Sequence, residues 1–162
     1  MAFTIEPMRS EDWPRVRDIY LEGIATGNAT FETEAPSWAD WDVGHLAFGR
    51  LVARDGADVI GWAALSPISK RSCYKGVTEV SLYVASSHRK QGVGKALLLA
   101  VIAESERRGI WTLQGGTFPE NQASLKLQAS CGFRVIGRRE RIGQLDGVWR
   151  DTIITERRSR LV

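Results

Sequence analysis

The sequence lacks the features that would direct it to an oxidising compartment or a membrane. Its two cysteines, Cys73 and Cys131, lie far apart with no second cysteine or histidine at ligand spacing, so neither a disulfide framework nor a metal site is predicted. The longest unbroken apolar run, 96–103, cannot span a bilayer, and the N-terminal region carries acidic residues but no hydrophobic leader. We therefore expect a cytoplasmic protein with reduced thiols, no metal and no membrane partner.

The chain also has little excess of charge of either sign. Its 22 basic and 19 acidic residues leave a net charge of +3, which is too small to indicate nucleic-acid binding by itself. Arginines are frequent in the last third of the chain, and we interpret them as solvated strand faces. No nucleic-acid partner is expected.

No low-complexity segment or linker divides the chain. Its 162 residues, 43% of them hydrophobic, suit one α/β domain over 1–162. Alternating apolar residues predict strands at 3–8, 50–54, 59–65, 79–84 and 110–116, then from 133, and finally at 152–156. Apolar residues at helical spacing and capping residues predict helices that begin near residues 10, 37, 92 and 119.

The stretch 79–95 carries the strongest functional signal. Apolar side chains alternate along 80–84, as in a half-buried strand, and from residue 93 they recur at helical spacing. Between the two elements, the segment RKQGVG at 89–94 places two glycines at a helix start, where backbone N–H groups and the helix dipole favour an anion. Its basic residues, together with Lys95, add positive charge. This pattern predicts a site for a phosphate or pyrophosphate.

Two other phosphate-binding motifs do not fit this stretch. A P-loop requires glycine in place of Arg89 and serine or threonine in place of Ala96, and a dinucleotide fingerprint requires glycine or alanine in place of Leu97. The pattern that remains, R-x-x-G-x-G after a strand that ends at Val84, resembles the acetyl-coenzyme A motif of the GNAT superfamily of N-acetyltransferases. A solvated basic helix start is the alternative interpretation.

Other segments extend the resemblance over nearly the whole chain. Asn121-x-x-Ser124 followed by Cys131-Gly132-Phe133 is similar to a second GNAT signature, although a helix cap and a glycine stop would explain it equally well. Six segments resemble the phosphinothricin acetyltransferase branch, and within it the arsinothricin-resistance type: 29–33, 66–67, 71–74, 79–84, 118–121 and 146–151. The fold implied is α/β: a single mixed, mostly antiparallel twisted sheet, splayed at its central strand, with helices on both faces. Fold and branch do not fix the substrate.

The resemblance implies acetyl-coenzyme A as cosubstrate and direct acetyl transfer to an amine. An α-amino group has a pKa of about 8 and is mostly charged at neutral pH, so a base is required. Glu79, at the start of the central strand, can take the proton directly or through one water, and the resemblance assigns it that role; the alternative is a strand-edge charge paired with an arginine. The resemblance also implies that the backbone N–H of Val84 stabilises the oxyanion. Cofactor contacts are expected from Leu82, Tyr83, Val84, Arg89, Lys90, Gln91, Gly92, Val93, Gly94, Lys95, Asn121 and Ser124.

Two positions depart from the pattern of the family. Gln128 stands where many members carry a tyrosine, so the group that protonates the departing thiolate stays unassigned. Ser124, Tyr83 and water are the alternatives, and the thiolate could also leave unassisted. Asp146 stands where phosphinothricin enzymes carry a histidine, which weakens the prediction of phosphinothricin itself.

A cation is expected to hold the phosphinate, sulfoximine or arsinate head of the substrate, and Arg71 with Tyr74 is the predicted pair. Phe31, Glu32 and Trp149 are predicted to line the pocket. The main hypothesis is acetylation of the α-amino group of such an amino-acid analogue, which would give resistance to an antibiotic or herbicide. The alternatives are a general L-amino-acid acetyltransferase, a peptide or protein N-terminal acetyltransferase, and a coenzyme A-binding module without catalysis. A homodimer is expected from the resemblance.

Overall fold

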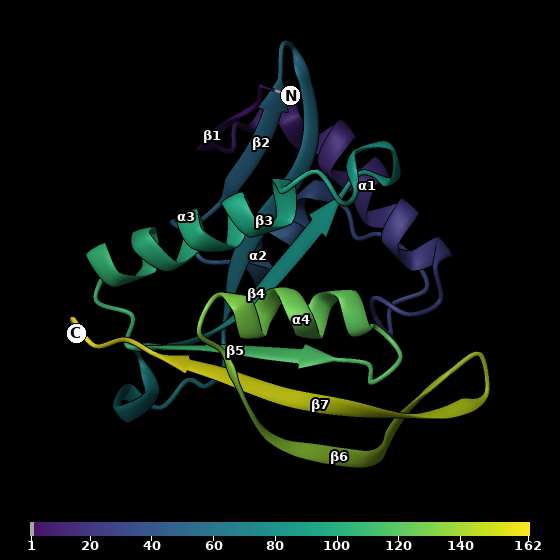
Figure 1. Ribbon diagram of the computed structural model, residues 1–162, viewed down its shortest axis with the longest axis vertical. Coiled ribbons are helices and arrows are strands. Elements are labelled where there is room, and N and C mark those ends of the chain that lie inside the picture. Colours follow the sequence, from purple (N-terminus) through teal and green to yellow (C-terminus); the bar gives the residue numbers. More distant parts are fainter. Residues whose placement is uncertain (1) are drawn as a thin grey trace.

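The computed structural model describes residues 2–162 and contains a seven-stranded twisted sheet (Figure 1). The strands in sheet order are β1 (Thr4–Pro7), β2 (Leu51–Asp55), β3 (Asp58–Pro67), β4 (Val77–Val84), β5 (Thr112–Thr117), β7 (Val148–Arg158) and β6 (Arg134–Leu145). The helices are α1 (Trp13–Ala25), α2 (Trp38–Gly44), α3 (Val93–Arg107) and α4 (Gln122–Ser130), with short 3-10 turns η1 (Ser10–Asp12), η2 (Ser72–Tyr74) and η3 (Ser86–His88). Every neighbouring strand pair is antiparallel except β4 with β5.

The central strands β4 and β5 separate soon after they begin. Their pairing covers only residues 77–79 against 112–114, although β4 continues to Val84 and β5 to Thr117. Their closed end is tight, because a Cβ added to Gly76 would lie 2.1 Å from the Trp111 ring. Beyond Glu79 the strands diverge and leave a gap in the middle of the sheet.

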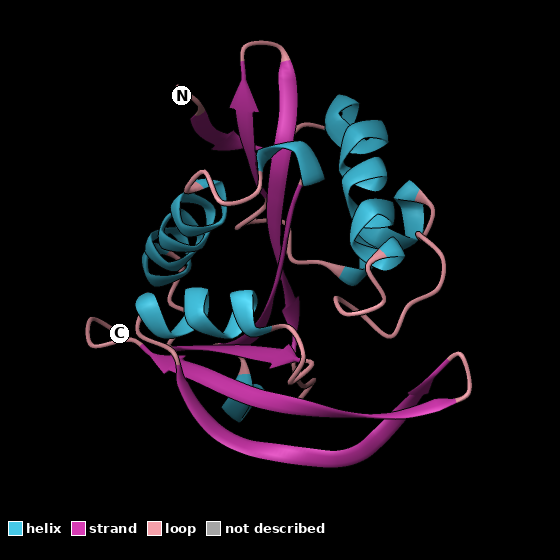
Figure 2. Cartoon of the chain, turned by 45° about the vertical axis from the view of Figure 1, so that its right-hand side comes forward, coloured by secondary structure: helices cyan, strands magenta, loops and turns pink. Residues whose placement is uncertain are grey.

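Each face of the sheet is covered by its own helices, and Figure 2 shows α3 and α4 on one side and α1 on the other. Alternating side chains of β3 supply both cores: Ala63 and Leu65 pack with α3, whereas Trp62 and Ala64 pack with α1 and α2. Trp62 and Leu65 are fully buried, so both faces contribute apolar burial to stability.

Strands β6 and β7 form a long arm that bends around one end of the molecule (Figure 1). The bend follows a bulge in β6 between Arg139 and Gly143, where Arg141 adopts a φ of 48°. Asp151 holds the bulge by accepting hydrogen bonds from the Arg141 backbone N–H and from Arg138 Nε, both at 2.7 Å. We call strands β6 and β7 together the arm.

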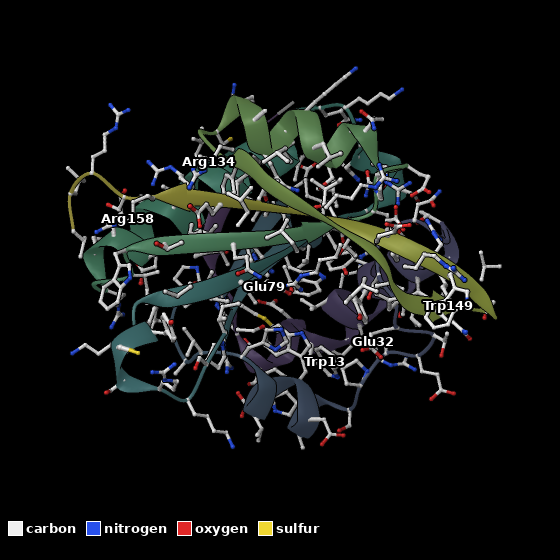
Figure 3. The ribbon with its side chains drawn as sticks, turned by 90° about the horizontal axis from the view of Figure 1, so that it is seen from below. Trp13, Glu32, Glu79, Arg134, Trp149 and Arg158 are labelled. Carbon is white, nitrogen blue, oxygen red and sulfur yellow. The ribbon has the colours of Figure 1, made fainter. Side chains whose placement is uncertain are left out.

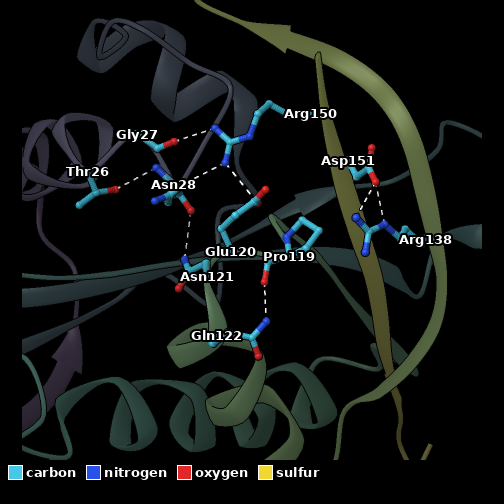
Figure 4. A network of polar contacts seen from close by, with 10 residues as sticks. All are labelled: Thr26, Gly27, Asn28, Pro119, Glu120, Asn121, Gln122, Arg138, Arg150 and Asp151. Atoms are coloured by element: carbon cyan, nitrogen blue, oxygen red, sulfur yellow. Dashed lines mark hydrogen bonds and ion pairs between the residues drawn. The ribbon is translucent and has the colours of Figure 1, made fainter. Parts of the chain in front are cut away.

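Arg150 ties the arm to two loops (Figure 4). Its guanidinium donates to the Gly27 carbonyl at 2.9 Å and to Asn28 Oδ1 at 2.7 Å, and it pairs with the Glu120 carboxylate at 3.3 Å. Asn121 Nδ2 in turn donates to the Asn28 carbonyl at 3.2 Å. The loop after α1, the loop before α4 and the arm are thus held together at one corner.

The structure confirms the predicted fold class: a mixed, mostly antiparallel sheet with a splayed centre and helices on both faces. The largest difference lies in the arm, where β7 is eleven residues long but only 152–156 were predicted. The first residues of β7 are exposed or only half-buried, and they pair with β6, most of whose side chains are exposed on both faces. The alternation that reveals a strand is therefore missing there. Within residues 2–162, no helix combines the length and apolarity that a membrane span requires.

Candidate active site

A cavity of about 1410 Å³ passes through the gap between β4 and β5. Residues 79–84 all line it, and consecutive strand residues point to opposite faces of a sheet. Val80, Leu82 and Val84 pack with the core on the α3 side, whereas Tyr83 packs with the core on the α1 side. The cavity therefore has two ends. The α3 end is lined by residues from the segments 82–95 and 121–128, except Tyr83 and Gln91, and the α1 end by Tyr20, Tyr83, Glu79, residues of the loop 26–36 and the arm.

The α3 end suits a pyrophosphate. Gly92 caps α3 with a φ of 84°, a left-handed conformation that glycine adopts without strain. The backbone N–H groups of the first turn have no partner within the helix, and together with the helix dipole they favour the binding of an anion. Arg89, Lys90 and Lys95 line the same end of the cavity. The turn brings backbone donors and three cations to one place.

The Val84 N–H points into the gap between the strands. Ala85 donates its N–H to the Ile60 carbonyl at 2.8 Å, and the register pairs Val84 with Gly61. Because hydrogen-bonded and non-hydrogen-bonded pairs alternate in antiparallel strands, the N–H of Val84 is directed away from β3. On that side β5 has already diverged, which leaves this donor available to a ligand.

Glu79 lies at the point where the gap opens, on the side of the sheet that faces α1. Its carboxylate makes no ion pair or side-chain hydrogen bond with residues 2–162. Burial raises its pKa, and the positive charge of Arg139 offsets part of that rise. A half-buried carboxylate with a raised pKa and no partner is suited to accept a proton.

Aromatic rings form one wall of the α1 end. The Tyr83 ring stacks on Trp62 with centroids 5.0 Å apart and meets Tyr20 edge to face at 4.9 Å. Gly23 admits this arrangement, since a Cβ there would lie 2.7 Å from Tyr83 Cδ1. Burial raises the pKa of the Tyr83 hydroxyl, and the neighbouring Thr30 hydroxyl only partly counters the effect. Tyr83 therefore stays protonated and forms part of the wall.

Gln128 organises a polar network at the α3 end. Its amide Nε2 donates to Thr117 Oγ1 at 2.8 Å and to Ser124 Oγ at 3.0 Å, and its Oε1 accepts from Thr155 Oγ1. Both amide hydrogens are engaged, so the Ser124 oxygen acts as an acceptor toward Gln128. The hydroxyl hydrogen of Ser124, which lines the cavity, remains free for another partner.

The arm closes the other side of the α1 end. Phe31 lies against Phe118 with centroids 4.8 Å apart, and a Cβ added to Gly143 of the arm would lie 3.0 Å from the Phe31 ring. Arg139 lies at the edge of the bulge and Ile142 within it, and both line the cavity. The bulge thus presses on the loop after α1 and brings a cation and an apolar side chain to the cavity.

The structure brings most of the predicted site residues to this cavity. They are Phe31, Glu32, Glu79, Leu82, Tyr83, Val84, Arg89, Lys90, Gly92, Val93, Gly94, Lys95, Asn121 and Ser124.

Four predicted residues lie outside the lining: Gln91, Arg71, Tyr74 and Trp149. Arg71 precedes η2 and Tyr74 is its last residue, shortly before the start of β4. The Arg71 guanidinium lies 5.4 Å from the centroid of the Tyr74 ring. Trp149 lies near the outer end of the arm, far from Glu79 in Figure 3, with Arg141 5.4 Å from its ring.

Several cavity residues were missed from the sequence: Tyr20, Gly23, Trp62, Arg139 and Ile142. Tyr20 and Trp62 carried only an apolar pattern, which indicates a core position as readily as a site. Arg139 was one arginine among many and had no local motif, so no signal in the sequence could single it out.

Three comparisons bear on what this cavity does. The family model of the acetyltransferase (GNAT) family matches residues 9–133. A phosphinothricin N-acetyltransferase of Alcaligenes faecalis is 33% identical over 96% of this chain and 82% of its own length.

Two solved structures share the fold. The phosphinothricin acetyltransferase of Sinorhizobium meliloti in complex with AcCoA has a TM-score of 0.88, with 28% identity over 98% of this chain and 89% of its own. The ribosomal-protein-alanine N-acetyltransferase of Brucella melitensis has a TM-score of 0.89, with 27% identity over 96% of this chain and 99% of its own.

Proposed function

The chain belongs to the acetyltransferase (GNAT) family and is an N-acetyltransferase that uses acetyl-coenzyme A, and we propose that its acceptor is the α-amino group of a small amino-acid analogue. The candidates are compounds of the phosphinothricin, arsinothricin or methionine sulfoximine type, and acetylation would detoxify them. The single observation that supports this proposal best is the cavity through the sheet, which joins a cationic turn to an unpaired carboxylate at Glu79.

The residues at the α3 end fit the cosubstrate. Acetyl-coenzyme A supplies an acetyl group as a thioester. The first turn of α3, with Arg89, Lys90 and Lys95, would hold its pyrophosphate. Asn121 and Ser124, at the start of α4, would contact its pantetheine arm.

Glu79 and Val84 would act on the acceptor and on the developing charge. Glu79 takes the proton that the amine must lose, directly or through one water, and its raised pKa makes it a stronger base than an exposed carboxylate. The N–H of Val84 donates to oxygen that becomes negative during transfer, and it is held in place by the β3–β4 pairing before any ligand binds.

We assign the stabilisation of the departing thiolate to Ser124. Gln128 Nε2 donates a hydrogen bond to Ser124 Oγ, so the Ser124 hydroxyl hydrogen is available to a different acceptor. A hydrogen bond from this hydroxyl would lower the energy of the thiolate, although serine is too weak an acid to transfer its proton fully. Tyr83 is a poorer candidate because its ring packs with the core on the α1 side and stacks on Trp62, whereas Ser124 lies at the α3 end.

We also propose a homodimer in the cytoplasm without a nucleic-acid partner. The arm exposes large apolar residues at both of its ends that a second copy could cover: Val135 and Ile136 near the start of β6, and Val148 and Trp149 at the start of β7. In addition, β6 is a long edge strand, which proteins seldom leave uncovered. Sedimentation velocity would test this, and a monomer at micromolar concentration would refute it.

A second candidate function is acetylation of a protein N-terminus. It is favoured by the fold shared with the ribosomal-protein-alanine N-acetyltransferase at 27% identity. In that case an extended peptide would enter the α1 end with its amine at Glu79. A general L-amino-acid acetyltransferase, the remaining alternative, would bind an ordinary amino acid in the same position.

The test is acetyl transfer by the purified protein. Coenzyme A release and the mass of the product would be measured with L-phosphinothricin, L-arsinothricin, L-methionine sulfoximine, L-methionine, L-glutamate and an alanine-initiated peptide. We expect kcat/KM for at least one of the three analogues to exceed that for the ordinary amino acids and the peptide by about tenfold or more. Faster acetylation of the peptide would overturn the proposal in favour of the second candidate, and faster acetylation of L-methionine or L-glutamate would favour a general amino-acid enzyme.

A further inference from the structure

An unpaired cation and an unpaired anion share the α1 end of the cavity. Arg139 and Glu79 both line it, and neither makes an ion pair or a side-chain hydrogen bond with residues 2–162. They are near enough for the charge of Arg139 to lower the pKa of Glu79, yet they do not touch. A space lies between the two charges.

The sheet register places both side chains on the same face. Glu79 is opposite Gln114, which is opposite Glu156 of β7. Thr152 is four residues from Glu156 on β7 and therefore points to the same side, and it pairs with Arg139. Thr152 and Arg139 both line the cavity, so this face of the arm is turned toward it. Figure 2 shows the bend of the arm.

The other arginines of this region are already engaged. Arg138 pairs with Asp151 and Arg134 with Glu156, while Arg150 is held by Glu120 and the loop after α1. Arg141 lies over the Trp149 ring. Among the described arginines of the arm, Arg139 is the one in the cavity lining that no protein group neutralises.

We propose that Arg139 binds the α-carboxylate of the acceptor, so that Glu79 and Arg139 together form a receptor for a zwitterionic α-amino acid. The ammonium group of such a molecule meets Glu79, and its carboxylate, two bonds away, meets Arg139. The charges of the pair then complement those of the ligand, and hydrogen bonds between charged groups are stronger than those between neutral groups. The inference rests on the proposed function and narrows it, because an amine without an adjacent carboxylate would leave Arg139 unpaired.

This arrangement distinguishes a free amino acid from a peptide. In a peptide the group next to the N-terminal amine is an amide, which carries no charge and offers Arg139 only a neutral acceptor. Arg139 is therefore a specificity-determining residue of the α1 end. Arg71, the cation that the sequence predicts for the head group of the substrate, lies outside the cavity lining.

The experiment compares each acid with its own carboxamide. Acetyl transfer to L-methionine sulfone and L-phosphinothricin, and to their α-carboxamides, would be measured for the wild type and for Arg139→Met, Arg139→Lys and Arg134→Met. The last variant is the matched control, because Arg134 is on the same strand, is exposed and lies outside the cavity lining. In parallel, tryptophan fluorescence would report binding of the same four compounds to the protein with coenzyme A, independently of turnover.

We expect the wild type to prefer each acid over its carboxamide by about 10- to 100-fold, which corresponds to the charged hydrogen bond. In Arg139→Met the ratio of acid to carboxamide should fall to about one. Acetyl transfer to the acid should become slower, whereas transfer to the carboxamide should stay within about threefold of the wild type. Arg139→Lys should keep part of the preference, and Arg134→Met all of it. An equal loss for acid and carboxamide, or no change in the ratio, would overturn the inference.

The two proposals can fail separately. If the acids bind in an Arg139-dependent way but are not acetylated, the proposed function is wrong and the Glu79–Arg139 binding site is supported. If the acids are acetylated with no dependence on Arg139, the binding site is wrong and the proposed function is supported. If neither acid binds nor reacts while the peptide does, both are wrong.

Discussion

The two ends of the cavity are built in different ways. The α3 end takes its strand, turn and helix start from one continuous stretch, residues 82–95, and its shape is fixed by local geometry such as the left-handed Gly92. The α1 end combines the loop after α1, the start of β4 and the bulge of β6, which lie far apart in the sequence. The ligand of the α3 end therefore depends on a local motif, whereas the ligand of the α1 end can be changed by single substitutions in separate segments.

The largest effect is expected from Glu79→Gln, which removes the base at the α1 end and leaves the α3 end intact. We expect kcat to fall by about 10²- to 10⁴-fold while the Kd of acetyl-coenzyme A stays within twofold. Stopped-flow kinetics and calorimetric titration would measure the two quantities. Glu11→Gln, on the exposed surface of η1, is the control. A loss of cofactor affinity as large as the loss of kcat would show that the ends are not independent.

The same contrast explains what could be predicted from the sequence. Gly92 and the basic residues around it form a local motif, so the sequence identified them and the structure brings nearly all of them to the cavity. Arg139 reaches the cavity only through a chain of strand pairings and a bulge, and none of these long-range contacts leaves a local pattern. The prediction of Arg71 as the cation had a motif behind it, but η2 stands outside the lining.

Gly92→Ala should affect the α3 end alone. An alanine there would have open space, since no atom lies within 4 Å of the added Cβ, but it would have to adopt a φ of 84° at a cost of about 1–2 kcal/mol. We expect the Kd of coenzyme A to rise about tenfold, with the KM of the amine within twofold of the wild type. Gly44→Ala, which also has open space but an ordinary φ, is the control for calorimetric titration. An unchanged Kd would mean that the turn does not hold the pyrophosphate.

Gly23→Ala is the reciprocal test, because it should affect the α1 end alone. The new Cβ would lie 2.7 Å from the Tyr83 ring and would push the ring out of its stack with Trp62. We expect the KM of the amine to rise about fivefold and the Kd of coenzyme A to stay unchanged.

Tyr83→Phe keeps the ring but removes the hydroxyl, and its steady-state kcat and KM should differ from those of the wild type by less than about twofold. A larger loss in Tyr83→Phe would give the hydroxyl a chemical role.

Ser124→Ala tests the proposed contact between the Ser124 hydroxyl at the α3 end and the departing thiolate. It should lower kcat about three- to fivefold, in line with the loss of one hydrogen bond of about 1 kcal/mol. Thr117→Val is the matched control, because it removes the other acceptor of the same Gln128 amide and leaves the Ser124 hydroxyl in place. If both variants lose kcat equally in steady-state assays, the network matters only as structure.

The smallest expected effect is a gain in stability for Glu79→Gln, and it follows from the raised pKa of the carboxyl. The folded state holds the Glu79 proton more tightly than the unfolded chain, whose pKa is near the ordinary 4.5, because burial disfavours the charge. That contribution is fully present below pH 4.5 and is lost as the pH rises through the folded-state pKa. Glutamine does not titrate, so the variant should unfold at a higher temperature than the wild type at pH 7–8 and lose this advantage near pH 4. For a domain of this size each kcal/mol appears as about 2–4 °C in the Tm measured by calorimetry. A Tm difference between the two proteins that does not change with pH would show that ionisation of Glu79 does not lower the free energy of unfolding.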